Sequence, residues 1–150
     1  MILQYPVSAK GLVPHRRPMR MVDTVLSVQS DGSGKAEFMV SEDNIFLDQD
    51  GFLAPEALAE MMAQTFAAVS GCLNSASGHH QPTGYLVGIK RLECADRAGK
   101  GQRLCIEVWP AGDFAGFVIV EARVSRQNQI LATGELKIWQ DPQSDQKEST

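Results

Sequence analysis

One carboxylate stands out by its surroundings. Glu60 lies within residues 54–73, a segment that has no Lys or Arg and is otherwise mostly apolar or small. A carboxylate among apolar groups is costly unless it is paired, hydrogen-bonded or protonated. Burial raises the pKa of a carboxyl group, so that Glu60 could hold a proton near neutral pH and give it to a leaving group. The alternative is that Glu60 points to water at the edge of the fold.

The segment around Glu60 has the pattern of a long helix. Pro55 suits the first turn, where its missing N–H is no loss, and Glu56 suits the positive end of the helix dipole. No broad charged face is present, so we expect this helix to be buried on most sides by a sheet. The apolar side chains at helical spacing are Leu58, Met61, Met62, Thr65, Phe66, Val69 and Leu73, and the small ones opposite them are Ala63, Ala67 and Gly71.

The rest of the chain reads as strands joined by short turns. Short connections, such as the turn expected at residues 111–113, favour antiparallel neighbours. The sequence therefore predicts an α+β fold with one helix on one antiparallel sheet, forming a single domain over residues 1–140. Residues 141–150 are polar and are expected to be a disordered tail. The predicted strands are residues 21–28, 35–40, 85–94, 103–109, 115–124 and 130–139.

Three loops separate these elements. Residues 12–20 hold two prolines around basic residues, which excludes the interior of a helix or strand. Residues 41–53 are rich in Asp, Asn and Gly and lead into the helix. Residues 74–83 are small and polar, and we expect them to form a mobile connection.

Composition excludes several classes of function. A hydrophobic content of 43% with 21% charged residues indicates a globular chain, and a net charge of −4 argues against a nucleic-acid surface. No stretch is long enough to span a bilayer, and the N-terminus lacks the features of a signal peptide. Three widely spaced cysteines predict no metal site and suit buried core positions in a reducing compartment, so we expect a cytoplasmic protein. The chain also lacks a glycine-rich phosphate loop and a nucleophile elbow.

Four segments, taken in order, resemble the 3-hydroxyacyl-acyl-carrier-protein dehydratases of the hotdog fold. Residues 12–23 resemble the Leu-Pro-His-Arg opening that leads into an apolar strand with Val-Asp. Residues 60–64, Glu-Met-Met-Ala-Gln, resemble the helix motif Glu-Ala-Met-Ala-Gln. Residues 85–89 resemble the next strand, and residues 101–104 resemble the Gly-Asp-x-Leu that begins the one after it.

The resemblance implies a hotdog: a long central helix wrapped by a five- to six-stranded antiparallel sheet. It also implies a homodimer with active sites between the subunits, which could assemble further or pair with a dehydratase paralogue. The implied reaction removes water from a 3-hydroxyacyl thioester on acyl carrier protein or coenzyme A, in fatty-acid or polyene-type biosynthesis. It needs no metal and no redox cofactor. Glu60 would be the acid, and the residues implied to contact substrate are Gln64, Tyr85, Leu86, Val87 and Gly88. An ordinary core strand explains Tyr85, Leu86 and Val87 equally well.

Two parts of the family's machinery are altered. Alignment on Glu60 places Phe46 where the family has the catalytic His of Gly-His-Phe-Pro, so this position could contact substrate but could not take a proton. Pro55 replaces a Gly whose backbone N–H helps to polarise the thioester carbonyl, and proline has no N–H. Glu56 and Ala57 still offer theirs, shifted by one or two residues.

Three replacements for the missing base remain open. His15, in the matched Pro-His-Arg segment, is the first choice, although it could instead make a structural hydrogen bond. Asp48 and Asp50 lie on the loop before the helix, where carboxylates also serve as caps. His79 and His80 follow the helix, where plain solvent exposure is the ordinary expectation.

The loop at residues 12–20 also carries a basic cluster. Arg16, Arg17 and Arg20 form the densest positive cluster of an acidic chain and could receive an acidic carrier protein, although a solvated basic loop explains them equally well. An alternative function is a catalytically impaired subunit that binds acyl chains or pairs with an active dehydratase. A third is a hotdog thioesterase, in which the helix carboxylate activates water.

Overall fold

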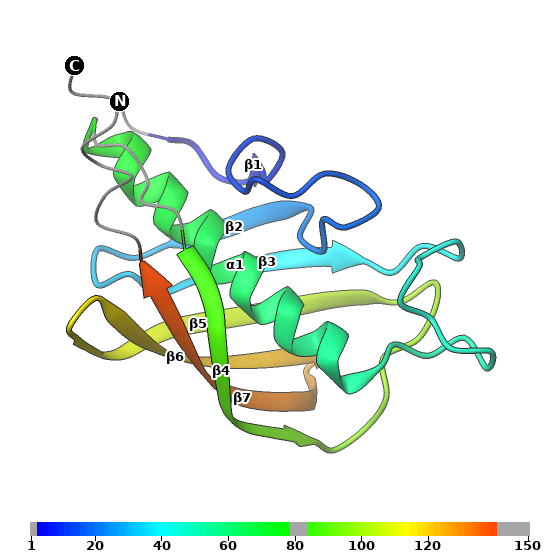
Figure 1. Ribbon diagram of the computed structural model, residues 1–150. Helices are drawn as coiled ribbons and strands as arrows, with labels where there is room; N and C mark the ends of the chain where they lie inside the picture. The colour runs from blue at the N-terminus through cyan, green and yellow to red at the C-terminus, as the bar shows by residue number, and fades with distance from the viewer. Residues whose placement is uncertain (1–2, 79–83, 141–150) are drawn as a thin grey trace.

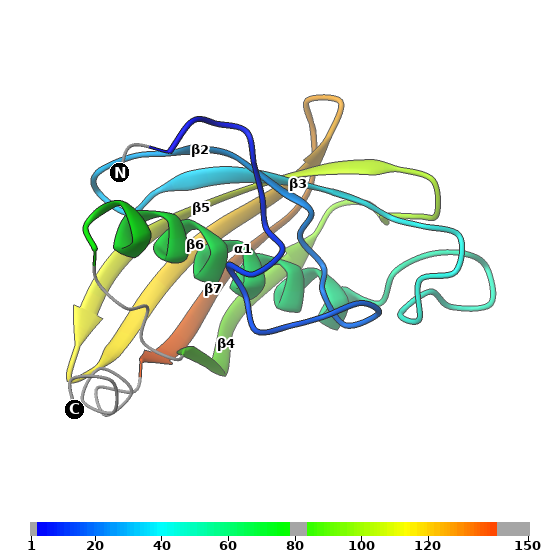
Figure 2. The ribbon, with the colours of Figure 1, turned by 90° about the horizontal axis from the view of Figure 1, so that it is seen from above.

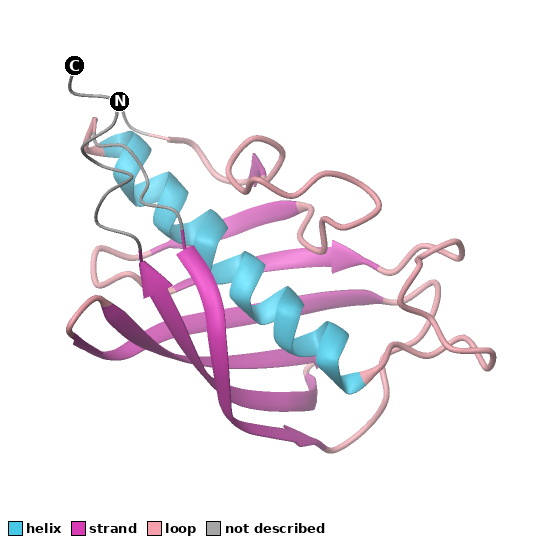
Figure 3. Ribbon diagram, viewed as in Figure 1, coloured by secondary structure: helices cyan, strands magenta, loops and turns pink. Residues whose placement is uncertain are grey.

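A long helix lies across one face of a single curved sheet. The computed structural model describes residues 3–78 and 84–140. The helix, α1, spans Pro55–Ala76 and crosses the sheet diagonally (Figures 1 and 3). The strands are β1 (Val7–Ser8), β2 (Thr24–Val28), β3 (Gly34–Met39), β4 (Gly84–Cys94), β5 (Arg103–Phe114), β6 (Phe117–Arg126) and β7 (Gln129–Gln140).

The order of the strands differs from their order in the chain. It runs β1-β2-β3-β5-β6-β7-β4, and every neighbouring pair is antiparallel. The chain therefore leaves the sheet after β3, forms α1, and returns at the far edge as β4. This topology confirms the predicted α+β hotdog with one helix on one antiparallel sheet.

Alternation along the strands builds the core against the helix. In β3 and β5, Ala36 lies opposite Ile106 and Phe38 opposite Leu104, and all four side chains are buried. Their neighbours along each strand face away from α1, as the period of two requires. The helix supplies twelve buried residues to the same core, which confirms that it is buried on most sides.

The structure corrects several predicted boundaries. The sheet has seven strands because the two-residue β1 adds an edge that the mixed sequence of residues 1–12 did not reveal. Residues 111–113 are not a turn but belong to β5, where a bulge between Pro110 and Gly112 takes up the irregular sequence. The turn comes later, at Ala115 and Gly116, which have positive φ values of 51° and 87°. The helix also continues to Ala76, three residues beyond the predicted end.

The structure bears on some of the remaining expectations, while others concern residues outside the described ranges. Cys72 is buried as expected, but Cys94 is exposed because it ends the edge strand β4. His79, His80 and the tail at residues 141–150 lie outside the described residues. Over the part of the chain that the structure describes, α1 is not apolar enough to cross a bilayer.

Close packing between β3 and α1 predicts a sensitive glycine. A Cβ atom on Gly34 would lie 2.7 Å from the carbonyl oxygen of Ser27 and 2.7 Å from a methyl group of Val69. We expect Gly34→Ala to lower the free energy of unfolding by about 1–3 kcal/mol, since overpacking forces the helix and sheet apart. Gly112→Ala is the control, because nothing lies within 4 Å of its added Cβ. Urea denaturation measures both, and equal midpoints for the two variants would contradict the packing argument.

Candidate active site

A cavity of about 510 Å³ runs beside α1. Six helix residues line it, and four of them, spaced three or four apart, are only partly buried and form a line along the helix. The first and last of these four lie ten residue steps apart, which corresponds to about 15 Å of helix. These residues are Glu60, Ala63, Ala67 and Ser70. The N-terminal loop and the ends of β4 and β7 close the cavity from the other sides.

Glu60 lies at one end of this cavity and has two polar neighbours. Its Oε1 atom lies 3.3 Å from Nε2 of His15 and accepts a hydrogen bond of 3.1 Å from Nε2 of Gln64. The Glu60 side chain is 35% exposed, so the predicted buried carboxyl group is only partly buried in the single chain. The structure thus brings together Glu60 and His15, two residues predicted to work as a pair.

Neither ring nitrogen of His15 faces the cavity freely. Nε2 is occupied by Glu60, and Nδ1 is buried with no hydrogen-bond partner among the described residues. A neutral imidazole that donates from Nε2 leaves Nδ1 as the acceptor, and an unpaired acceptor is easier to bury than an unpaired N–H. This geometry suits a ring that holds Glu60 in place.

Gln64 ties the helix to the N-terminal loop. Its side chain is 1% exposed. Its Oε1 atom accepts a 2.6 Å hydrogen bond from the backbone N–H of Met21, and its Nε2 atom donates to the carbonyl oxygen of Met19 at 3.0 Å as well as to Glu60. One buried amide therefore fixes the loop that carries His15 and orients the carboxylate that His15 contacts. Figure 2 shows this N-terminal segment, in dark blue, crossing in front of α1.

Strand β4 contributes half of the residues predicted on it. Tyr85 and Leu86 line the cavity, whereas Val87 and Gly88 are absent from its described wall. A bulge between Leu86 and Gly88 shifts the register there and leaves Val87 51% exposed. On the neighbouring strand β7, Ile138 pairs with Leu86 and also lines the cavity, although the sequence pattern indicates it only as an ordinary strand residue.

The loop before the helix lies apart from this cavity. Phe46, the residue that aligns with the family's base, packs against the core and is not part of the described cavity wall. The Asp48 carboxylate accepts hydrogen bonds from the backbone N–H groups of Phe52 and Asp50, and the bond from Phe52 is the main cause of its lowered pKa. Asp48 therefore acts as a turn cap, and Asp50 is exposed beside it.

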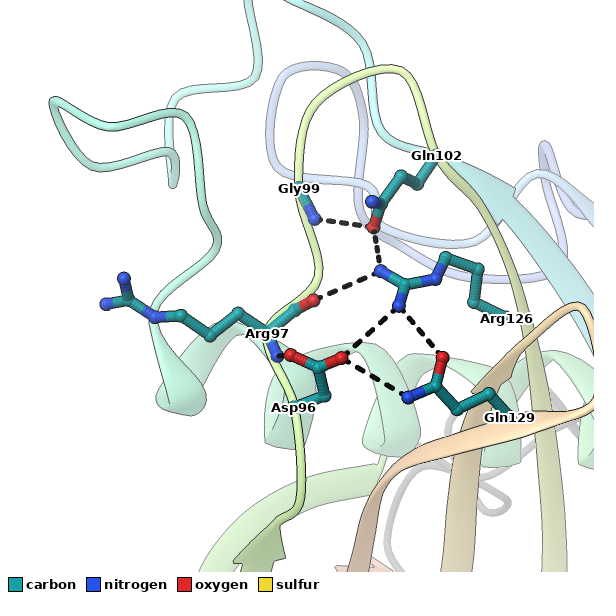
Figure 4. Close-up of polar contacts among 6 residues, drawn as sticks. All are labelled: Asp96, Arg97, Gly99, Gln102, Arg126 and Gln129. Carbon is teal, nitrogen blue, oxygen red and sulfur yellow. Dashed lines mark hydrogen bonds and ion pairs between the residues drawn. The ribbon is translucent and has the colours of Figure 1, made fainter.

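A second loop fixes the start of the helix. The backbone N–H of Leu53 donates to the carbonyl oxygen of Ala98, and Arg97 lies over the ring of Phe52 while pairing with Asp48 at 3.5 Å. Figure 4 shows how this second loop is itself anchored to the β6–β7 hairpin. There, Arg126 and Gln129 both contact the carboxylate of Asp96. The pKa of Asp96 is lowered, mainly by a hydrogen bond from the backbone N–H of Arg97 and further by Arg126 and Gln129.

At the helix N-terminus, the backbone N–H groups of Glu56 and Ala57, which could replace the one missing at Pro55, are not equivalent. The N–H of Ala57 donates to the carbonyl oxygen of Ala54 at 3.0 Å, so it is already engaged. Glu56 is exposed in the first turn, where helix N–H groups lack intrahelical partners. Neither residue belongs to the described cavity wall, and of the two only the amide of Glu56 remains unengaged by a turn hydrogen bond among the described residues.

The basic residues lie around a neighbouring hollow. Arg16, Arg17 and Arg20 line a depression of about 670 Å³ that shares His15 with the cavity beside α1. The structure adds Lys10 to this cluster. Among residues 3–78 and 84–140, no group of three or more His, Cys, Asp or Glu side chains is arranged to hold a metal ion.

Comparison with known families identifies the chain. Residues 7–149 match the ApeP-like family, described as ApeP dehydratase. The chain belongs to the ApeP-like dehydratase family. This finding confirms the resemblance to hotdog dehydratases that the sequence motifs indicated.

Solved structures agree with this family. The dehydratase heterocomplex ApeI:P from Xenorhabdus doucetiae contains a chain that is 26% identical, with a TM-score of 0.82 over 93% of this chain and 95% of that one. A hypothetical thioesterase with coenzyme A from Streptococcus pneumoniae is 12% identical, with a TM-score of 0.61 over 78% of this chain and 84% of that one. At that identity, the likeness shows the shared fold alone. Among curated sequences, the uncharacterized protein YcsD of Bacillus subtilis is 29% identical over 128 residues, which cover 85% of this chain and 94% of YcsD.

We call the hydrogen bonds from the Gln64 side chain to the backbone of Met19 and Met21 the Gln64 clamp. The clamp predicts a large effect of one apolar substitution on stability. Gln64→Leu keeps a similar volume but leaves the Met21 N–H without its buried partner. We expect the free energy of unfolding to fall by about 1–3 kcal/mol, the usual cost of an unsatisfied buried group. The exposed Gln29→Leu is the control, and its effect should stay within about 0.5 kcal/mol. Urea denaturation followed by circular dichroism measures both, and an unchanged midpoint for Gln64→Leu would exclude the clamp.

Proposed function

We propose that this protein takes part in the dehydration of a 3-hydroxyacyl thioester carried on acyl carrier protein, with Glu60 as the proton donor. The observation that carries this proposal is the Glu60 carboxyl group, held by Gln64 and His15 at the end of a cavity in a dehydratase family. The 15 Å wall along α1 has room for an acyl chain of moderate length.

The chemistry assigns one proton to each of two groups. A base removes the proton on the carbon next to the thioester carbonyl, and the electron pair left behind forms the new double bond. The bond to the hydroxyl group breaks as Glu60 gives its proton, so that water leaves. The first-turn amide of Glu56 stabilises the negative charge that develops on the thioester oxygen. The proton on the base must then return to Glu60 before the next turnover.

The base in this scheme comes from a second subunit. His15 has both nitrogens occupied or buried, and its direct contact with Glu60 leaves no room for the substrate between the two groups. Phe46 cannot take a proton. A paralogous hotdog subunit with His at the position of Phe46 would supply the missing group, and His15 then serves to position Glu60. The similarity to a chain in a dehydratase heterocomplex supports this arrangement.

The edge strand β4 provides the surface for such a subunit. Its outer edge has no neighbouring strand among the described residues, and Tyr85, Val87 and Ile89 are each about half exposed there. An unpaired edge with apolar side chains is a template for pairing with another chain. A second copy of this chain could use the same edge as a homodimer, but the missing base favours a paralogue.

The carrier protein would approach from the basic loop. Arg16, Arg17 and Arg20 lie beside the cavity and complement an acidic carrier. The three cysteines are free thiols, which suits a reducing compartment such as the cytoplasm, and we place the reaction there in fatty-acid or polyene-type synthesis.

The decisive experiment mixes the proposed halves. A 3-hydroxyacyl carrier substrate is incubated with this protein alone, with a hotdog paralogue that has His at the Phe46 position, and with both. We expect the enoyl product from the mixture. Glu60→Gln in the mixture should lower the rate by about 100-fold or more, because general acid catalysis contributes at least that much. Arg103→Gln, a change on the opposite side of the sheet, should leave the rate unaltered.

Three outcomes would count against the scheme. Full turnover by this protein alone would remove the need for a base from a partner. Full turnover by the Glu60→Gln mixture would remove the assigned acid. Release of free acid in place of enoyl thioester would favour a thioesterase, the third function that the sequence left open.

A further inference from the structure

The hollow beside the active site has an unusual concentration of positive charge. It is lined by Lys10, Arg16, Arg17 and Arg20, which are four of the chain's 14 Lys and Arg residues. Residues 1–22 contain no Asp or Glu, although the chain as a whole has a net charge of −4. The hollow is therefore a local site for an anion in a protein that otherwise repels anions.

Most of this charge is not neutralised within the described residues. Arg17 pairs with Asp23 at 3.6 Å, but its side chain is 72% exposed, which limits the value of that pair. Lys10, Arg16 and Arg20 have no ion-pair partner among residues 3–78 and 84–140. The Nε atom of Arg20 is buried and makes no hydrogen bond there. A buried, unpaired guanidinium N–H is costly, so its position favours an external acceptor.

The hollow and the active-site cavity are neighbours. Gly11, Val13, Pro14 and His15 line both of them. The wall between them is held rigidly, because Gln64 on α1 bonds to the backbone of Met19 and Met21 at the end of the same loop. A ligand group bound in the hollow would therefore lie at a fixed place relative to Glu60.

We propose that this basic hollow binds the phosphate of the phosphopantetheine arm on the carrier protein. The inference rests on the proposed function, which brings a carrier-bound thioester to Glu60. Arginine suits this task because its planar guanidinium group binds phosphate oxygens through two parallel hydrogen bonds. Arg20 is the key residue of the subsite because its buried Nε atom lacks a hydrogen-bond partner among the described residues, and Lys10 adds a point charge to the same lining.

The test measures binding without chemistry. Hexanoyl-phosphopantetheine, hexanoyl-pantetheine without phosphate, and hexanoyl-CoA are titrated into the wild-type protein by calorimetry at low salt, and a hexanoyl carrier protein is titrated alongside. Since the hexanoyl group has no hydroxyl to eliminate, binding is independent of turnover. We expect the phosphorylated arm to bind about tenfold more tightly than the arm without phosphate, which corresponds to one good charge-assisted contact.

Variants locate the effect within the hollow. Arg20→Gln should reduce the tenfold preference for phosphate to near one and leave the affinity for hexanoyl-pantetheine unchanged. Arg103→Gln, an arginine of β5 that lies outside the hollow and pairs with Glu37, should keep the full preference. Equal affinities for the two arms in the wild-type protein would overturn the proposal, as would a loss of affinity for both arms in Arg20→Gln.

Further outcomes distinguish the carrier protein from coenzyme A as the source of the phosphate. They also distinguish failure of the phosphate subsite from failure of the proposed dehydration. Tighter binding of hexanoyl-CoA than of the hexanoyl carrier protein would overturn the carrier as the source. A phosphate preference that persists in a protein without dehydratase activity would support the subsite and refute the proposed reaction. Dehydration without any phosphate preference would refute the subsite and support the proposed reaction.

Discussion

A single buried amide connects the parts of this site. Gln64 accepts from the backbone of Met21, donates to the backbone of Met19 and donates to Glu60, so its hydrogen-bonding groups serve both the loop and the helix. Because a buried polar group must be satisfied, the helix, the N-terminal loop and the carboxylate cannot move independently. The position of His15 against Glu60 follows from this constraint, since the loop that carries it ends at the residues that Gln64 holds.

The curved sheet explains why the clamp is possible. It covers most of α1, leaving one line of residues from Glu60 to Ser70 only partly covered. Small side chains at Ala63 and Ala67 keep this line open, and the N-terminal loop closes over it. The strand order places β4 at the outer edge of the same sheet, where it has no second neighbouring strand within residues 3–78 and 84–140. The cavity and the edge for a partner are thus two results of one topology.

This chain departs from the dehydratase pattern in a consistent way. The loop before the helix has Phe46 in place of a base, and its carboxylate Asp48 is used as a cap that fixes the turn. Arg97 and the network around Arg126 then hold this loop against the sheet. The loop positions the helix N-terminus, while the Glu60 carboxyl group and the basic loop lie beside the cavity. Under the proposed function, in which a second subunit supplies the base, the loop needs only this structural role.

Local patterns in the sequence were enough to predict the helix, six of the strands and the α+β class. These features depend on periodicity and on motifs, which act over a few residues. The two-residue β1, the bulges that displace Val87 and extend β5, and the exposure of Cys94 at the sheet edge depend on pairing between distant segments. The contact between His15 and Glu60, and the clamp by Gln64, join residues more than forty positions apart. Only the packing of the loop on the helix could decide them, because no local propensity records which buried donors will meet which acceptors.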